Sequence, residues 1–389
     1  MIPYQPKPAS VAAFELGQTL DQQGKTHEAV ESLTEAIAAD GQFWEAYQLR
    51  ARLYGKLGDK FHYRVDKSHA DWLKHRWILE PYRVRPGDRR TTPEPVLDNT
   101  QDFPELKSLA TTTVRLHPRF GDEPAINASK LGGTFLWPAE ESWPVCSTHQ
   151  IPLVSVLQLR ANDFPEMPFP LGKDLFQMLW CPREHSESSE SGRHWADPAF
   201  FWRKREDITR PRIENPAPLD PFYEYVPFPC RLMPERVVEY PSEYDLDNQL
   251  VERIYAWQDA NLRVNEKGWR EHKYCYEFEF SVCAATKIGG YLNWIQFPWK
   301  PTCSCGRLME HLLTIESIEG NANRWIPIEE QRLFKTLDIS DTDWDTPDNQ
   351  VRRALCNPTG LMLGDCGNMQ LFVCRHCPGW PIVPSIACC

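Results

Sequence analysis

The sequence lacks the features that mark secreted, membrane-spanning and nucleic-acid-binding proteins. Its opening residues, MIPYQPKPAS, contain no charged segment followed by an apolar core, and no run approaches the roughly 18 apolar residues that cross a bilayer. The formal net charge of −11 disfavours a nucleic-acid partner, because phosphate binding requires a positive surface. We therefore expect a cytoplasmic protein that binds neither membrane nor nucleic acid.

Motifs of the common enzyme classes are also absent. The sequence contains neither GxxxxGK nor GxGxxG, so no glycine-rich phosphate loop is expected. HExxH and GxSxG, which mark two large groups of hydrolases, are missing as well. The isolated catalytic candidates, Asp365 in a Leu-Gly turn and Cys374 near His376, have simpler roles as a turn residue and a metal ligand. We predict that the chain is not an enzyme.

The residues that are abundant point to short strands, ordered loops and metal binding. A chain of 389 residues suits two or three domains, and 41% hydrophobic with 25% charged residues is the balance of a folded protein. The 34 prolines and 15 tryptophans favour short strands and ordered loops beyond the N-terminal part. In a reducing cytoplasm, 13 cysteines suit metal sites or free thiols better than a disulfide framework.

The N-terminal region has the periodicity of paired helices. A shift of 34 residues carries Gly17 to Ala51 and Gly24 to Gly58, and the intervening apolar residues keep the spacing of a tetratricopeptide repeat. Residues 10–79 therefore resemble two such repeats and are expected to form four helices. Two repeats are fewer than the roughly three usually needed for stability, so the arm should pack on the rest of the chain or on a partner. It is either a recognition surface or a hairpin that caps the larger domain.

The larger C-terminal part of the chain contains an internal repeat. KLGGTFLWP begins at Lys130 and KIGGYLNWIQFP begins at Lys287, and the same shift of 157 residues aligns the Trp, Pro and Cys that follow. QMLWC ending at Cys181 and QLFVC ending at Cys374 extend the match. The expected regions are a helical region at 1–85, a linker at 86–109, copy one at about 110–185, an insertion at 186–275 and copy two at about 276–389.

The repeat also indicates the fold. Paired glycines suggest backbone with positive φ, and short apolar runs with proline-rich joins favour antiparallel sheets. We predict an α+β protein in which N-terminal α-helical hairpin repeats precede an internally duplicated, mainly antiparallel β domain (residues 110–389) with pseudo-twofold symmetry. Apolar residues at helical spacing between Tyr244 and Leu262 predict one amphipathic helix inside the insertion.

Each copy presents two pairs of potential metal ligands at equivalent places. The eight candidates are Cys303, Cys305, Cys374 and Cys377 in copy two and Cys146, His149, Cys181 and His185 in copy one. Zinc prefers four tetrahedral ligands, and a full set of thiolates and imidazoles makes a closed structural site. We predict one or two structural zinc ions. The alternatives are buried thiols without metal in copy two, and ordinary surface histidines at positions 149 and 185.

The large domain also resembles a known family. KLGG with a nearby Trp-Pro, DLFQMLWCPREH, KIGG with Trp-Ile-Gln, and GDCGNMQLFVCRHC are similar to the YwqG-like domain of unknown function, and more distantly to programmed cell death protein 2. The resemblance covers most of residues 115–385 and implies a duplicated α+β architecture with no established reaction. It further implies a chaperone-like role in the eukaryotic relatives and toxin-neutralising immunity in some bacterial ones. Many family members lack the cysteines, so metal binding is inferred from this sequence alone.

These features predict a non-catalytic protein-binding protein with structural zinc. The acidic charge favours a basic partner, and the most specific form is an immunity protein that blocks a toxin. One alternative is a chaperone-like holder of a client protein; another is a zinc-dependent hydrolase or transferase, which requires an incomplete ligand set. The aromatic residues considered for the partner surface, each with core packing as the alternative, are Trp195, Phe200, Phe201, Trp202 and Trp257.

Overall fold

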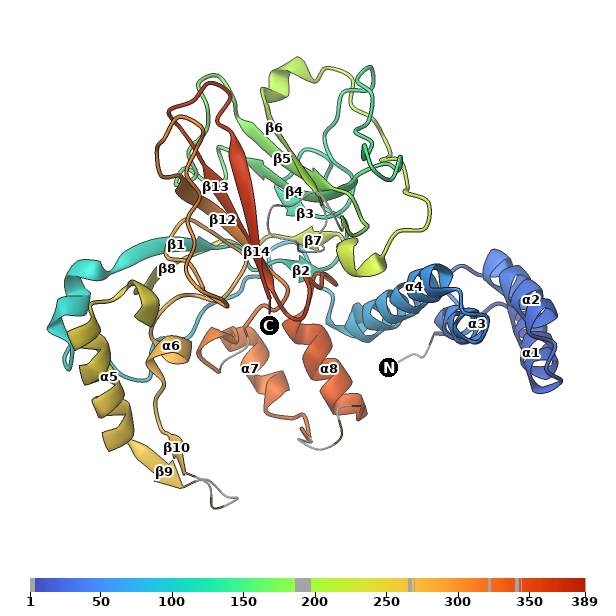
Figure 1. Ribbon diagram of the computed structural model, residues 1–389, viewed down its shortest axis with the longest axis horizontal. Coiled ribbons are helices and arrows are strands. Elements are labelled where there is room, and N and C mark those ends of the chain that lie inside the picture. The colour runs from blue at the N-terminus through green and yellow to red at the C-terminus, as the bar shows by residue number, and fades with distance from the viewer. Residues whose placement is uncertain are drawn as a thin grey trace.

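A helical arm and a two-sheet β domain make up the protein (Figure 1). The computed structural model describes residues 4–185, 197–264, 268, 270–320, 323–339, 343 and 345–388. Within these ranges, no helix combines the length and apolar character that crossing a membrane requires. The predicted class, helical hairpins followed by antiparallel sheets in an α+β fold, is confirmed.

The arm consists of the four helices expected from the sequence. They are α1 (Pro8–Gln22), α2 (Thr26–Ala39), α3 (Trp44–Lys56) and α4 (Lys60–Leu79). Gly17 lets the first pair approach closely, because a Cβ atom there would lie 2.9 Å from Cγ of Leu33. Leu33 and Leu53 are fully buried in the small core of the arm, as the repeat spacing predicts.

Helix α4 joins the arm to the β domain. Nε1 of Trp72 donates a hydrogen bond to the carbonyl of Val226 at 2.7 Å, and Nε2 of His75 lies 2.8 Å from the carbonyl of Asn357. Burial lowers the pKa of His75 to about 4, so this imidazole is neutral at physiological pH. The arm therefore packs on the rest of the chain, which is one of the two arrangements expected for so few repeats.

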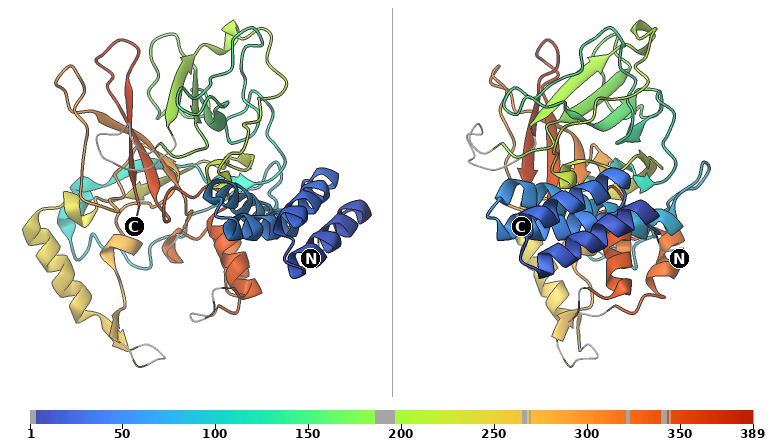
Figure 2. Two further views of the ribbon diagram at one scale, coloured as in Figure 1. Left: turned by 45° about the vertical axis from the view of Figure 1, so that its right-hand side comes forward. Right: turned by 90° about the vertical axis from the view of Figure 1, so that its right-hand side faces the viewer.

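Two six-stranded antiparallel sheets form the β domain (Figures 1 and 2). One has the order β2-β7-β3-β4-β5-β6 and the other β14-β13-β12-β11-β1-β8. The first-half strands are β1 (Thr111–Arg115), β2 (Arg119–Phe120), β3 (Lys130–Leu131), β4 (Val154–Arg160), β5 (Leu175–Trp180) and β6 (Pro198–Arg203). Those of the second half are β7 (Cys230–Arg231), β8 (Glu235–Glu239), β11 (Lys287–Ile288), β12 (Glu310–Glu316), β13 (Asn368–Val373) and β14 (Ile382–Ala387).

The two sheets repeat one pattern of pairing. Lys130 in β3 lies opposite Gln158 in β4, and Lys287 in β11 lies opposite Thr314 in β12. A register shift interrupts β4–β5 and β12–β13 at equivalent places. Each sheet also contains a strand from the other half, since β1 pairs with β11 and β7 pairs with β3. Such reciprocal exchange is expected of two units related by a pseudo-twofold axis, and it confirms the internal repeat.

The strands of copy two begin earlier, and those of copy one end later, than the predicted boundaries imply. The stretch 186–275, predicted as an insertion, contributes β6, β7 and β8 to the sheets. The sequence contains a signal for this: RLHP beginning at Arg115 recurs as RLMP beginning at Arg231, a shift of 116 residues. The two glycine motifs, at Lys130 and Lys287, are separated by the longer shift of 157 residues because helix α5 (Asn248–Ala260) lies between β8 and β11. This helix confirms the predicted amphipathic helix.

The remaining elements lie on the connections. Strands β9 (Leu262–Val264) and β10 (Arg270–His272) form a small hairpin. The further helices are α6 (Tyr276–Glu279), α7 (Ile328–Phe334) and α8 (Pro347–Cys356). Short 3-10 helices span Glu80–Tyr82, Pro104–Leu109, Arg205–Asp207, Tyr223–Tyr225, Glu243–Asp245 and Asn323–Trp325. Helices α7 and α8 lie between β12 and β13 in sequence, and α8 lies beside α4 in space (Figure 1). The connection between β4 and β5 contains no helix.

The sheets share one large core and cover two small ones. Val156 and Phe176 from one sheet and Leu313 and Leu371 from the other belong to a single buried cluster. Smaller clusters lie beneath the loops that precede β4 and β12, one around Trp137 and one around Trp294. Each of these clusters contains two of the candidate ligand cysteines as buried members.

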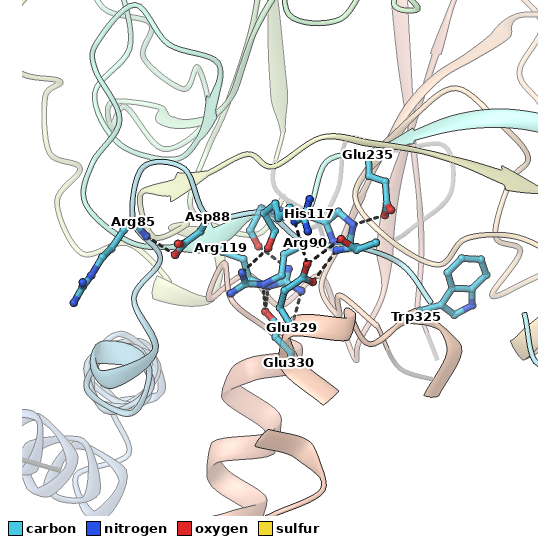
Figure 3. Close-up of polar contacts among 12 residues, drawn as sticks. Arg85, Asp88, Arg90, His117, Arg119, Glu235, Trp325, Glu329 and Glu330 are labelled. Atoms are coloured by element: carbon cyan, nitrogen blue, oxygen red, sulfur yellow. Dashed lines mark hydrogen bonds and ion pairs between the residues drawn. The ribbon is translucent and has the colours of Figure 1, made fainter. Parts of the chain in front are cut away.

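The linker at 86–109 is fixed to the domain by ion pairs. Arg90 and Arg119 both donate to the buried carboxylate of Glu330 on α7, at 2.5 Å and 2.7 Å (Figure 3). Although burial raises the pKa of Glu330, the two guanidinium groups hold it at about 2. Thr91 adds a backbone and a hydroxyl hydrogen bond to Glu329, both 2.8 Å long. The connection between arm and sheets is therefore anchored in α7.

Candidate metal centres

The strand pairing brings each distant ligand pair next to its partner pair. In each half, one pair lies on the loop before β4 or β12, and the other follows β5 or β13. Val154 at the start of β4 lies opposite Trp180 at the end of β5, and Glu310 lies opposite Val373 in the same way. Antiparallel pairing thus places both loops at one edge of the sheet. All eight predicted ligands come together in two tetrads, with the ligand atoms of each tetrad within 4.8 Å of one another.

The first tetrad has the spacing of a tetrahedral site with mixed ligands. Sγ of Cys146 lies 3.6 Å from Nδ1 of His149 and 3.5 Å from Nε2 of His185. Nδ1 of His149 lies 3.3 Å from Sγ of Cys181. Tetrahedral zinc with ordinary Zn–S and Zn–N bonds would separate sulfur from nitrogen by about 3.5 Å. These three separations match those of a tetrahedral zinc site.

The second tetrad has the spacing of four thiolates. Sγ of Cys303 lies 3.6 Å from that of Cys377, and Sγ of Cys305 lies 3.7 Å from that of Cys374. Tetrahedral thiolates at ordinary Zn–S distances would be about 3.8 Å apart, whereas a disulfide would hold its sulfurs about 2.05 Å apart. The four sulfurs are therefore arranged for a shared metal ion and not for disulfide bonds.

The two tetrads differ in their exposure to solvent. In the first, Cys146, Cys181 and His185 are buried and His149 is half-buried. Burial raises the pKa of Cys181 to about 12, so loss of this proton requires a bound cation. In the second, the backbone N–H of Cys305 lowers the pKa of the Cys303 thiol to about 6, and hydrogen bonds with Cys305 and Cys303 raise that of Cys377 to about 12, while Cys305 itself is exposed. The second site is therefore more accessible to chelators and oxidants.

Sulfur and imidazole donors in tetrahedral sets suit zinc better than magnesium or calcium, which prefer oxygen ligands. Both tetrads can thus hold a metal ion, and their donor chemistry points to zinc. Neither presents a carboxylate or an incomplete set, because each supplies four protein ligands. A tetrahedral site of this kind has no coordination position left for water or substrate.

The other residues singled out in the sequence lie away from these centres or pack inside the fold. Asp365 is exposed in a turn, and His376 faces Arg307 at 3.3 Å while Cys374 joins the tetrad. The aromatic residues of β6 and Trp257 are half-buried against the cores, so the core-packing alternative holds for them. Trp195 lies outside the described residues.

Two exposed aromatic residues beside the second tetrad were not anticipated. Phe297 is 90% exposed and Trp299 is 53% exposed, although both lie on the loop that leads to Cys303. The repeat contains the signal for them, because copy one has the polar residues Glu140 and Ser142 at the equivalent places. Sequence periodicity alone could not show which loop is covered by another part of the chain.

The geometry thus defines two closed ligand sets on equivalent loops, one buried and one partly exposed. The strands that carry the two ligand sets follow the same order in their sheets. No protein-family profile matches this chain, and no curated protein matches it.

Proposed function

We propose that this chain is a non-catalytic protein-binding protein whose two tetrads hold structural zinc. The observation that carries the proposal is the closure of both ligand sets, since four protein ligands at tetrahedral spacing leave no position for a substrate. The resemblance to the YwqG-like family, in which no reaction is established, supports the same conclusion. The zinc-dependent hydrolase alternative required an incomplete set, and neither tetrad provides one.

In this proposal zinc takes the place of a larger core beneath the loops. The cluster under the second tetrad contains Leu292, Trp294, Met309 and Phe372 as its buried residues besides the ligand cysteines. So few apolar side chains contribute little stabilisation, whereas a structural zinc site contributes folding free energy directly. Zinc would tie the loop before each central strand to the end of the neighbouring strand and hold the loop surfaces in one conformation.

The arm offers one surface for a partner. A groove of about 750 Å³ is lined by Phe14 on α1, Arg52 on α3, and Tyr63 and Lys67 on α4. Glu45 also lines it, and one oxygen of this carboxylate is buried without a hydrogen-bond partner among the described residues. Burial raises the pKa of Glu45, so a cationic group would relieve the cost of ionising it. This carboxylate and the chain's net charge of −11 favour a basic partner, such as a toxin held by an immunity protein.

The test combines a metal count with ligand substitution and an activity-independent measure of folding. Two zinc ions per chain are expected by mass spectrometry of the purified protein, and Cys374→Ser should lose one of them together with thermal stability. A variant that loses zinc but keeps its full stability would instead point to a non-structural site and would contradict the proposal.

The identity of the partner separates the two binding roles. An immunity protein forms a stable complex with a folded basic protein, whereas a chaperone-like holder prefers unfolded clients. Glu45→Gln should weaken binding of a folded basic partner because it removes the carboxylate from the groove. Equal binding by the variant would show that the groove is not the contact.

A further inference from the structure

The loop before the first tetrad is covered by the segment that follows β6. In this segment the carbonyl of Arg210 accepts a hydrogen bond of 2.8 Å from the N–H of Ala139, and the N–H of Arg212 donates one of 2.7 Å to the carbonyl of Trp137. The two bonds flank an antiparallel bridge between Pro138 and Pro211. Residues 204–215, called here the cover segment, therefore run across the loop like an added short strand.

Arg203 at the end of β6 completes this cover. Its guanidinium lies 4.0 Å from the ring centroid of Trp137 and donates to both oxygens of Glu141, at 2.7 Å and 2.6 Å. Trp137 is fully buried as a result. The acidic loop of copy one is thus closed by an extended, arginine-bearing part of the chain.

No comparable segment crosses the equivalent loop of copy two among the described residues; after β14, only the carbonyl of Cys388 reaches it, accepting a hydrogen bond of 2.8 Å from Nε2 of Gln296. The carbonyl of Trp294 and the N–H of Gln296, which correspond to the bonded groups of Trp137 and Ala139, make no hydrogen bond there. The place of Arg203 in β6 is taken by Ala387 in β14. Phe297 and Trp299 stand exposed on this loop, and Leu308, which forms a β-bridge with Thr302 on the same loop, is 63% exposed.

We propose that this open loop is the docking surface for an extended segment of the protein partner that is both acidic and apolar. The surface comprises Phe297, Trp299, Lys300, Arg307 and Leu308 and is called the loop-two surface. The inference rests on the proposed protein-binding function and adds to it the place and the chemistry of one contact. The template for the contact is the chain's own cover segment on copy one.

Charge complementarity indicates that the docking segment of the partner is acidic. The loop of copy one carries Glu140 and Glu141 and receives arginines from its cover. Residues 293–309 contain no carboxylate but include Lys300 and Arg307. Lys300 lies 4.0 Å from Asp245, whereas Arg307 faces His376 and no carboxylate among the described residues. The local sign is opposite to that of the whole chain, so acidic residues are required of the docking segment and not of the entire partner.

The backbone groups and the aromatic residues set the mode of binding. The partner's N–H would donate to the carbonyl of Trp294, and its carbonyl would accept from the N–H of Gln296, as Arg212 and Arg210 do in copy one. Its apolar side chains would cover Phe297 and Trp299, which are the kind of residue that dominates binding energy once desolvated. Its carboxylates would lie near Lys300 and Arg307.

The assignment is tested by selecting peptides that bind the zinc-loaded full chain from a random library of 12-residue peptides. Enriched peptides are expected to combine Asp or Glu with aromatic or aliphatic residues. A synthetic peptide from the selection should bind the double variant Phe297→Ser/Trp299→Ser at least about tenfold more weakly than the wild type. Leu171→Ser, which removes a fully exposed apolar residue from the connection between β4 and β5, is the matched control and should bind normally.

A second variant keeps the test independent of the aromatic residues. Lys300→Glu/Arg307→Glu should abolish the preference for acidic peptides, and raising the salt concentration should weaken wild-type binding. Enrichment of basic peptides, no enrichment, or equal binding to the aromatic double variant would each overturn the assignment. So would a dimer of the free chain that Phe297→Ser/Trp299→Ser dissociates, because the occupant would then be a second copy.

The zinc content of the same preparation separates the two proposals. Two zinc equivalents without peptide enrichment would overturn the loop-two surface alone. A folded, stable chain without zinc would overturn the structural-zinc proposal whatever the peptides show.

Discussion

The two halves of the β domain share their strand order and differ in what closes them. In copy one a short connection (161–174) joins β4 to β5, and the cover segment seals the loop before the first tetrad. In copy two a long connection (317–367) carries α7 and α8, which hold the linker and the arm, while the loop before the second tetrad is exposed. Registers and ligand positions have been kept in both halves, and the connections are where the halves have diverged.

A buried lysine shows the same divergence at one equivalent position. Lys287 and Glu239 are fully buried together, with Nζ 2.7 Å and 3.0 Å from the carboxylate oxygens. Lys130 instead donates to the carbonyls of Pro124 and Thr134, and burial lowers its pKa to about 8. In copy two a buried carboxylate thus compensates the charge of the lysine, whereas in copy one the lysine is stabilised by hydrogen bonds to backbone carbonyls. The predictions below test whether such differences have energetic consequences.

The largest effect is expected from loss of a metal ligand in either half. Cys181→Ser and Cys374→Ser should each lose one zinc equivalent, because structural zinc is worth about 10 kcal/mol or more in small zinc domains. Cys181→Ser should be the more destabilising, since no residue of the first tetrad is exposed, whereas Cys305 of the second is. Metal analysis and thermal unfolding measure both effects.

Cys366→Ser is the matched control for these two variants, because Cys366 lies outside both tetrads and should keep two zinc equivalents. A chelator should remove zinc first from the second site, where Cys305 is exposed. Simultaneous release from both sites would contradict the difference between the halves.

The buried ion pair of copy two should produce the next largest effect. Glu239→Gln leaves Lys287 charged in a fully buried site and should lower the free energy of unfolding by about 4 kcal/mol. Glu123→Gln, at the equivalent position in copy one, should cost about 1 kcal/mol or less, because Glu123 is exposed and accepts a hydrogen bond from the N–H of Thr134. Urea unfolding of the two variants measures the difference.

The double variant Glu239→Gln/Lys287→Met provides the internal check. Removing the uncompensated charge should restore part of the stability lost in the single variant. Equal losses for Glu239→Gln and Glu123→Gln would show that the two lysine sites are energetically alike.

The sequence contains enough to predict the repeat, the four arm helices and the eight residues of the two tetrads. Repeated motifs place equivalent residues at equivalent strand ends, so the meeting of Cys303 with Cys377 follows from the pairing of β12 with β13. The start of copy two was missed because β7 has two residues and its RLMP motif occurs at a different shift. The anchoring of the linker could not be predicted, because Glu330 lies far from Arg90 in the sequence and only the fold brings them together.

The anchoring of the linker by copy two gives a pH-dependent prediction. The pKa of Glu330 is about 2 in the folded protein and near 4.5 when the chain is unfolded, so its ionisation contributes about 3 kcal/mol. This contribution is complete above about pH 4.5 and is lost as the pH falls toward 2. The stability difference between wild type and Glu330→Gln should therefore shrink on acidification, as thermal unfolding at several pH values would show.

The matched control for this prediction lies in the short connection of copy one. Asp174→Asn alters a hydrogen bond of 2.7 Å from the N–H of Arg205 and should cost about 1 kcal/mol. Zinc release in acid affects wild type and variants alike, so it cancels in the comparison. A difference for Glu330→Gln that stays constant down to pH 2.5 would contradict the assigned pKa.

A smaller loss is expected where the cover of copy one is weakened. Arg203→Met keeps an apolar side chain but removes the guanidinium group that lies over Trp137, with both its hydrogen bonds to Glu141 and the one of 3.0 Å to Oε1 of Gln177. We expect a loss of about 1–2 kcal/mol and greater solvent exposure of Trp137, seen as a red shift of tryptophan fluorescence. An unchanged emission spectrum would mean that the backbone bonds of the cover segment suffice to bury this ring.

The smallest effect on stability should come from the loop-two surface. Phe297 is 90% exposed, so Phe297→Ser removes little buried area and should change the free energy of unfolding by less than about 0.5 kcal/mol. Trp143→Ser in the equivalent loop of copy one should cost about 3 kcal/mol or more, because that ring is buried and its Nε1 donates to the carbonyl of Leu153 at 2.8 Å. Urea unfolding of both variants tests the contrast between a closed loop and an open one. A large loss for Phe297→Ser would mean that Phe297 is buried in solution, and the surface assigned to the partner would then already be occupied.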